Sequence, residues 1–268
     1  MIDDYQPLDG ADRWFIDIMK SVEAPGFLLV QEVDMTATRE IIGRLRRQGL
    51  KVTYTHVVMR AVALALARHP ELNRLILGKQ VVRPGTIDLS MSVGTGLSMA
   101  AEPTAVVQCA DQLDLVDTYH EVSRKAAEVR AHAEEGLAQT RRLTRIIPFG
   151  WLRRWLIKRM KRRMSMIRER LGVFHVTSSP QMQLGVPFVF AGIGLIGICR
   201  VELGVMVRDA QPVVRPITRL CMVGDHRLWK AVEASTMINE VTKILETGEL
   251  ASEVPPVQGG RGEFRIAA

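Results

Sequence analysis

The sequence predicts a single α+β domain. Short runs rich in β-branched residues alternate with segments in which apolar residues recur every three or four positions, the pattern of helices that cover a sheet. No segment repeats, and no Pro-, Gly- or Ser-rich linker divides residues 1–247. The expected strands are 27–33, 81–82, 87–93, 104–109, 174–178, 188–193, 196–201, 205–208 and 213–223.

Each expected helix has a local signal of its own. The helix over 57–68 stops before Pro70, Thr55 is its candidate N-terminal cap, and its almost wholly apolar interior predicts burial on several sides. The helix over 232–245 is amphipathic, with apolar residues three and four positions apart. The full set of expected helices is 12–21, 35–48, 57–68, 114–137 and 232–245.

Length and composition favour a globular protein of the reducing cytoplasm. The 268 residues are 47% hydrophobic and 24% charged, and no apolar run is long enough to span a bilayer. The acidic N-terminus lacks the basic-then-apolar pattern of a secretory signal. Three cysteines in apolar surroundings are more typical of small buried hydrophobes than of a disulfide framework. Residues 248–268 are rich in Pro and Gly and are expected to form a flexible tail.

One segment carries the basic excess of the chain. The net charge is +7, but residues 141–170 alone hold twelve Lys or Arg and one acid, Glu169, which gives 12 − 1 = +11. Trp151, Trp155 and two methionines lie about one helical turn apart within it, so we expect a basic amphipathic helix. Three interpretations follow: a packed helix with a solvated charged face, a contact with an anionic membrane surface, or an electropositive wall for a phosphorylated ligand.

Two other functions have little support in the sequence. Nucleic-acid binding is disfavoured because only 5% of the residues are aromatic and no recognition motif is present. Residues 192–197 match the glycine pattern G-x-G-x-x-G of dinucleotide-binding proteins, but the pattern requires a helix after its third glycine. The residues that follow are typical of a strand, so these glycines are expected to mark a bend or a close approach in a sheet. The sequence indicates no metal site.

His226 is the strongest catalytic candidate. It comes directly after the apolar strand 213–223 and before the helix 232–245, and such junctions support reactive side chains on a rigid frame. Histidine is also the side chain best suited to take up and return a proton near neutral pH. The alternative is a half-buried histidine that bonds to backbone.

The order of these segments resembles the catalytic domain of the dihydrolipoyl acyltransferases of 2-oxo-acid dehydrogenase complexes and, more distantly, chloramphenicol acetyltransferase. Residues 31–36 are similar to the family's first strand and turn, 53–73 to its buried helix, and 172–178 to its G-T-F-T-I-S segment. Residues 225–227, Asp-His-Arg, resemble the start of its D-H-R-x-x-D-G signature. The basic segment 141–170 looks like an insertion relative to the family.

The resemblance implies a two-layer sandwich, with a mixed sheet covered by helices, that forms trimers. It also implies acyl transfer between thiols, in which the histidine deprotonates coenzyme A or dihydrolipoamide and a hydroxyl from a neighbouring subunit stabilises the oxyanion. The matching positions are His226 as base and Thr177 as donor, with Ser178 as the alternative donor. No lipoyl domain is recognised in this sequence, so an acyl carrier or acyl-CoA is expected to arrive in trans.

The signature departs from the family at its end. The family has Asp-Gly four and five residues after the histidine, whereas this chain has Lys230 and Ala231. In the family that aspartate pairs with an arginine near the first helix, for which Arg13 is the counterpart here, and a Lys230–Arg13 pair would bring like charges together. Either the loop with Asp225 and Arg227 is rebuilt around Lys230, against Glu233 or Asp225, or the chain is a catalytically inactive trimeric scaffold.

Overall fold

The computed structural model describes residues 9–19, 26–77, 80–96, 102–185 and 192–256. Within them, seven strands form one mixed sheet in the order β1-β9-β7-β6-β4-β5, and β8 pairs with β9. A separate hairpin joins β2 (Leu75–Leu77) to β3 (Gln80–Val82). The strands of the large sheet are β1 (Gly26–Asp34), β4 (Leu89–Ser92), β5 (Thr104–Val107), β6 (Phe174–Ser178), β7 (Gly194–Ile198), β8 (Glu202–Arg208) and β9 (Gln211–Asp225).

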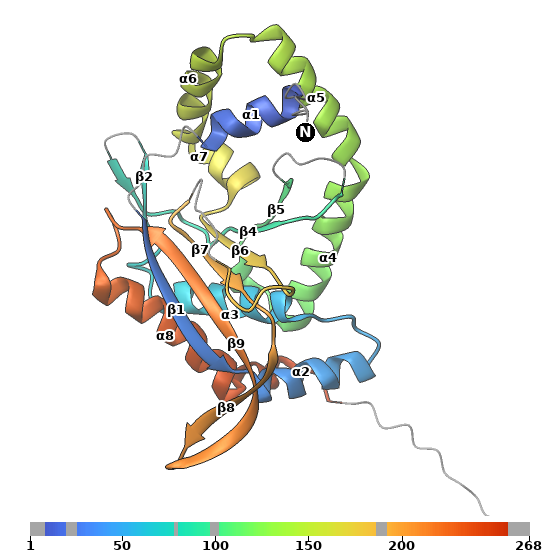
Figure 1. The fold of residues 1–268 in the computed structure, drawn as a ribbon, viewed down its shortest axis with the longest axis vertical. Helices are drawn as coiled ribbons and strands as arrows, with labels where there is room; N and C mark the ends of the chain where they lie inside the picture. The colour runs from blue at the N-terminus through green and yellow to red at the C-terminus, as the bar shows by residue number, and fades with distance from the viewer. Residues whose placement is uncertain (1–8, 20–25, 78–79, 97–101, 186–191, 257–268) are drawn as a thin grey trace, which may run out of the picture.

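Helices cover this sheet and extend beyond it (Figure 1). The α-helices are α1 (Gly10–Met19), α2 (Thr36–Arg47), α3 (Tyr54–Arg68), α4 (Leu115–Ala131), α5 (Ala133–Ile146), α6 (Gly150–Lys161), α7 (Met164–Met166) and α8 (Ala231–Thr247). Short helical turns are η1 (Ala110–Gln112), η2 (Ile167–Leu171) and η3 (Glu249–Glu253). The predicted α+β class, a mixed sheet covered by helices, is confirmed.

The core lies between the sheet and the helices α3 and α8. Helix α3 is buried on several sides, as its apolar interior predicts, and it packs against α8 and β6. The amphipathic face of α8, from Ala234 to Leu245, is buried against the same core. Trp229 and Phe174 are among the largest wholly buried side chains. The core therefore reaches the end of β9, where His226 follows.

Several local boundaries differ from the sequence-based prediction. The N-terminal cap of α3 is Thr53 and not Thr55, because the Thr53 hydroxyl lies 2.7 Å from His56 Nδ1 and its backbone N–H donates to that same nitrogen at 3.0 Å. The single helix predicted over 114–137 breaks at His132, which separates α4 from α5. The predicted strand 188–193 falls mostly on 186–191, which lie outside the described residues.

The packed part of the chain continues past residue 247. Residues Glu249–Glu253 form η3, in which Leu250 is buried and Glu253 forms an ion pair with Arg60 at 2.7 Å. The predicted tail therefore begins later than 248, and its residues 257–268 lie outside the described residues.

The glycine run at 192–197 belongs to the sheet, as predicted. β7 begins at Gly194 and no helix follows it. A Cβ on Gly194 would lie 2.9 Å from the Val223 carbonyl oxygen and 2.8 Å from Phe174, so only glycine fits between these two strands. The pattern reflects close packing of strands and not a pyrophosphate site.

Candidate functional site

The imidazole of His226 stands on a tight turn that ends β9. The N–H groups of Leu228 and Trp229 both donate to the Asp225 carbonyl oxygen at 3.0 Å, and the His226 side chain is exposed at the tip. His226 Nδ1 lies 3.0 Å from the Trp229 carbonyl oxygen. Because a carbonyl oxygen can only accept, Nδ1 carries the hydrogen, and Nε2 of the neutral ring is left as a proton acceptor. This is the tautomer that a general base requires.

Trp229, which our sequence reasoning missed, anchors the histidine turn in the core. Its indole N–H donates to the Leu72 carbonyl oxygen at 3.1 Å, and its ring stacks on Phe174 and Phe27 with centroids 5.9 and 6.5 Å apart. Phe27 in turn meets the His226 ring edge-on at 5.9 Å. The signal in the sequence was an aromatic residue three positions after the histidine.

Asp225 fixes the other side of the turn. Its carboxylate is buried and accepts from the Arg227 backbone N–H at 3.0 Å and from Arg227 Nε at 2.9 Å. Arg227 Nη2 also donates to the Asp225 carboxylate, at 2.5 Å. Charge-assisted bonds of this kind are the stronger ones in proteins, so the pairing of Asp225 with Arg227 stabilises the backbone of the turn.

Lys230 does not meet Arg13 in the described structure. Its backbone N–H donates to Glu233 Oε2 at 3.2 Å, directly before α8 begins. The backbone N–H groups of Glu233 and Lys230 lower the pKa of the Glu233 carboxyl. Arg13 lies on α1 and is exposed, and its Nε lies 3.4 Å from the carbonyl oxygen of Asp9, directly before that helix. The described structure therefore contains no Lys230–Arg13 pair, in agreement with the expected repulsion between these like charges.

Arg74, just before β2, supports the histidine turn instead. Its Nη2 donates to the Leu228 carbonyl oxygen at 2.7 Å and lies 3.4 Å from Glu233 Oε1. The loop is thus rebuilt around Glu233, one of the two arrangements that the Lys230 substitution left open. Arg74 gave no signal in the sequence because 154 residues separate it from Leu228.

Thr177 lies far from His226 within one chain. Strand pairing places Thr177 beside Gly197, and Gly197 beside Cys221, which is five residues before His226. At ~3.3 Å per residue, the two side chains are separated by about 16 Å along the strands alone. One copy of the chain therefore does not bring the predicted base and the predicted oxyanion donor together.

Thr177 faces a small pocket of about 140 Å³ between β6, β7 and the turn after β6. Ser178 is exposed and, as its neighbour on a strand, points to the opposite face of the sheet. The geometry favours Thr177 over Ser178 as the hydroxyl of a site on that pocket. The pocket is lined by Thr177, Ser179, Met182, Gly185, Gly197, Ile198 and Cys199.

The cysteines beside this pocket are poor nucleophiles. Cys199 and Cys221 are buried, with their sulfur atoms 3.8 Å apart. Burial, together with the neighbouring thiol, raises the pKa of Cys221 to about 11, so this thiol stays protonated near neutral pH. These contacts agree with the interpretation of Cys199 and Cys221 as buried apolar groups, whereas Cys109 is only half-buried.

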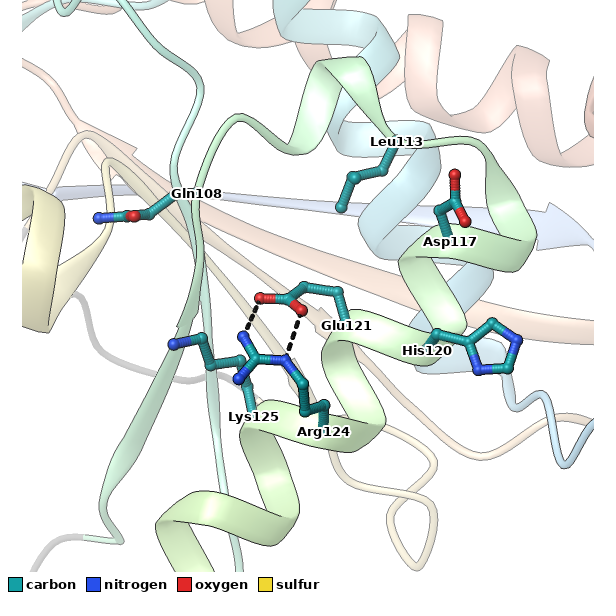
Figure 2. A pocket seen from close by; sticks show the side chains of 7 residues that line it. All are labelled: Gln108, Leu113, Asp117, His120, Glu121, Arg124 and Lys125. Carbon is teal, nitrogen blue, oxygen red and sulfur yellow. Dashed lines mark hydrogen bonds and ion pairs between the residues drawn. The ribbon is translucent and has the colours of Figure 1, made fainter.

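A polar groove lies between α4 and the end of β5, away from the histidine turn (Figure 2). Its main charges neutralise each other: Arg124 donates to both Glu121 oxygens at 2.6 and 2.8 Å, and these bonds lower the pKa of Glu121. Among the described residues, no cluster of three or more His, Cys, Asp or Glu could hold a metal ion. None of the described helices is long and apolar enough to cross a membrane; the cytoplasmic location stays a prediction.

Comparison with known proteins identifies the family. Residues 4–140 match the model of the 2-oxoacid dehydrogenases acyltransferase (catalytic domain) family. The chain belongs to this family. The match ends directly before the basic segment 141–170, whose interpretation as an insertion stays a prediction.

Individual members of the acyltransferase family resemble the chain moderately. The acetyltransferase component of the acetoin cleaving system of Bacillus subtilis is 33% identical over 107 residues, 39% of this chain and 26% of that protein. The acetyltransferase component of its pyruvate dehydrogenase complex is 24% identical over 85% of this chain and 46% of that protein. The chain thus spans half or less of the length of these relatives.

A solved structure confirms the acyltransferase fold. The truncated catalytic core of the 2-oxoacid dehydrogenase multienzyme complex from Thermoplasma acidophilum superposes with a TM-score of 0.67 at 19% identity. The alignment covers 92% of this chain and 99% of that one.

Proposed function

We propose that this chain transfers an acyl group between thiols, with coenzyme A or a lipoyl-type thiol as a substrate. The observation that carries the proposal is the His226 tautomer: the Trp229 carbonyl occupies Nδ1 and leaves Nε2 as the acceptor on an exposed turn. The family membership supplies the reaction class. The acyl group itself is not specified by these residues.

In the proposed reaction, His226 Nε2 takes the proton of the incoming thiol, and the thiolate sulfur attacks the carbonyl carbon of the thioester. The new C–S bond forms as the carbonyl becomes an oxyanion, which accepts a hydrogen bond from the Thr177 hydroxyl. Collapse of this intermediate breaks the old C–S bond, and the leaving thiolate regains the proton from His226. Atoms and charge balance, and no further reactant is needed.

We infer that the site forms between two copies of the chain, because His226 and Thr177 of one copy lie at opposite ends of the strands. The hairpin of β8 and β9 supports self-association, since it projects from the body (Figure 1) and exposes an apolar strip. The strip consists of Leu203, Val205, Val207 and Val214. A homotrimer, with the hairpin in its interface, is the assembly we propose.

Acyl exchange between an acyl-CoA and dihydrolipoamide, followed by chromatography of the thioesters, tests the reaction. His226→Ala is expected to lower turnover about 10²–10⁴-fold, and Thr177→Ala about 10²–10³-fold, with Thr177→Ser retaining most activity. Light scattering of the same samples should give a trimer for every variant. If wild type and His226→Ala are both inactive across a panel of acyl-CoAs, the proposed acyl transfer is wrong and the chain is better described as a trimeric scaffold.

A mixing experiment tests the shared site. His226→Ala and Thr177→Ala chains, co-expressed with different tags, are each inactive alone. If base and donor come from adjacent copies, random mixing restores both groups at about a quarter of the sites in a closed ring. A site within one chain would recover no activity on mixing, and that result would refute the inter-subunit arrangement.

A further inference from the structure

Helix α6 turns two tryptophans outward and an arginine inward. A helix that packs on a globular protein normally turns its apolar stripe inward and its charges outward. Here Arg153 is buried at 5% exposure, whereas Trp151 is 64% and Trp155 53% exposed. Ile157 is also buried, so the interpretation of a core-facing apolar side holds for Ile157 but not for the two tryptophans.

A buried ion pair fixes this orientation. Asp17 of α1, 3% exposed, accepts from Arg153 Nε at 2.6 Å and from Arg154 Nη1 at 2.8 Å. Arg153 Nη1 also donates to the carbonyl oxygens of Ile147 and Pro148 at 2.8 and 3.0 Å, where α5 ends. The connection between α5 and α6 is thus held from inside, and the tryptophans cannot turn inward without breaking these bonds.

Helix α5 is attached to α1 in the same manner. The Thr144 hydroxyl donates to the Gly10 carbonyl oxygen at 2.8 Å, and Arg141 forms a 2.7 Å ion pair with Asp9. The helices α1, α5 and α6 therefore form a rigid group at one end of the elongated molecule, opposite the end that carries the β8–β9 hairpin (Figure 1).

The outward surface of this group combines apolar and cationic side chains; we call it the basic aromatic face. Phe149 and Trp151 have ring centroids 6.4 Å apart, and the Arg159 guanidinium lies 5.8 Å from the Trp155 ring centre. The exposed apolar members are Leu143, Ile146, Phe149, Trp151 and Trp155, and the exposed cations are Arg142, Arg145, Arg159, Arg162 and Arg163.

We propose that the basic aromatic face docks on an anionic phospholipid surface. Tryptophan prefers the boundary between lipid headgroups and acyl chains, and arginines bind the phosphates beside it. A second copy of the chain is disfavoured as the occupant, because the segment carries +11 and two such faces repel each other. Nucleic acid is disfavoured because the exposed aliphatic side chains of Leu143 and Ile146 can neither stack on its bases nor form hydrogen bonds with them.

Vesicle sedimentation of the full chain tests the docking. We expect binding to phosphatidylcholine vesicles that contain phosphatidylglycerol, weak binding to phosphatidylcholine alone, loss of binding at high salt, and a blue shift of tryptophan emission. Trp151→Ser with Trp155→Ser, and separately Arg159→Glu with Arg162→Glu, should each weaken binding at least about tenfold. All four side chains are exposed or face outward, so circular dichroism and sizing should match wild type.

Arg39→Glu with Arg47→Glu is the matched control, because it makes the same charge change on the exposed side of α2. This variant should bind within about twofold of wild type. The proposal is overturned if wild type ignores anionic vesicles, if neutral vesicles bind equally, or if both test variants bind as the control does. Retention of duplex DNA without vesicle binding would also overturn it and assign the face to nucleic acid.

Discussion

Asp17→Ala is expected to be among the most destabilising single substitutions at the α1–α5–α6 group. It removes the carboxylate that faces Arg153, and both side chains are almost wholly buried. A buried guanidinium without its counterion costs roughly 3–5 kcal/mol, since its desolvation is no longer offset. Arg153 keeps its two bonds to the carbonyls of Ile147 and Pro148, which places the expected loss toward the lower figure.

Urea denaturation followed by circular dichroism measures this loss. Arg154→Met is the internal comparison: Arg154 also contacts Asp17 but is 35% exposed, so its removal should cost no more than about 1 kcal/mol. The double variant Asp17→Ala with Arg153→Met removes both charges and should recover much of the loss. A smaller stability loss for Asp17→Ala than for Arg154→Met, or a double variant no more stable than Asp17→Ala, would show that the buried ion pair does not stabilise this group.

Three further predictions concern the histidine turn and the sheet. Arg74→Met removes the bond to the turn that carries His226 and should lower acyl transfer about 10–100-fold with a small effect on unfolding; unchanged turnover would contradict its positioning role. Burial lowers the pKa of His175 from 6.5 to about 4. Between these two pH values the unfolded chain protonates this histidine and the folded chain does not, so the free energy of unfolding falls as the pH drops from 6.5 to about 4. His175→Gln should flatten this loss, worth up to about 3 kcal/mol, in urea midpoints taken at neutral pH and near pH 4. Gly192→Ala should destabilise the protein by about 1–3 kcal/mol, because the φ of Gly192 is +81° and a Cβ would lie 2.5 Å from the Val173 carbonyl oxygen. The control Gly136→Ala adds a Cβ in open space on α5 and should leave stability unchanged or raise it. Equal melting temperatures of the two variants would refute the clash.

The sequence by itself predicted most of the strands and helices, the burial of α3, the strand identity of the glycine run and the position of His226 at a strand end, but not β2. These features depend on periodicity and on neighbours in the chain, which one sequence displays directly. The family resemblance followed from the same local segments. The cap at Thr53 and the break at His132 were missed, because a shift of one or two residues leaves the periodic pattern unchanged.

Only the tertiary structure decided what the distant segments do to one another. Arg74 meets the histidine turn, and Asp17 turns Arg153 inward and the tryptophans outward, through contacts that span more than a hundred residues. The separation of His226 from Thr177 likewise depends on strand register. Helical periodicity does not reveal which side of α6 is buried, since a single buried counterion is enough to turn Arg153 inward beside Ile157.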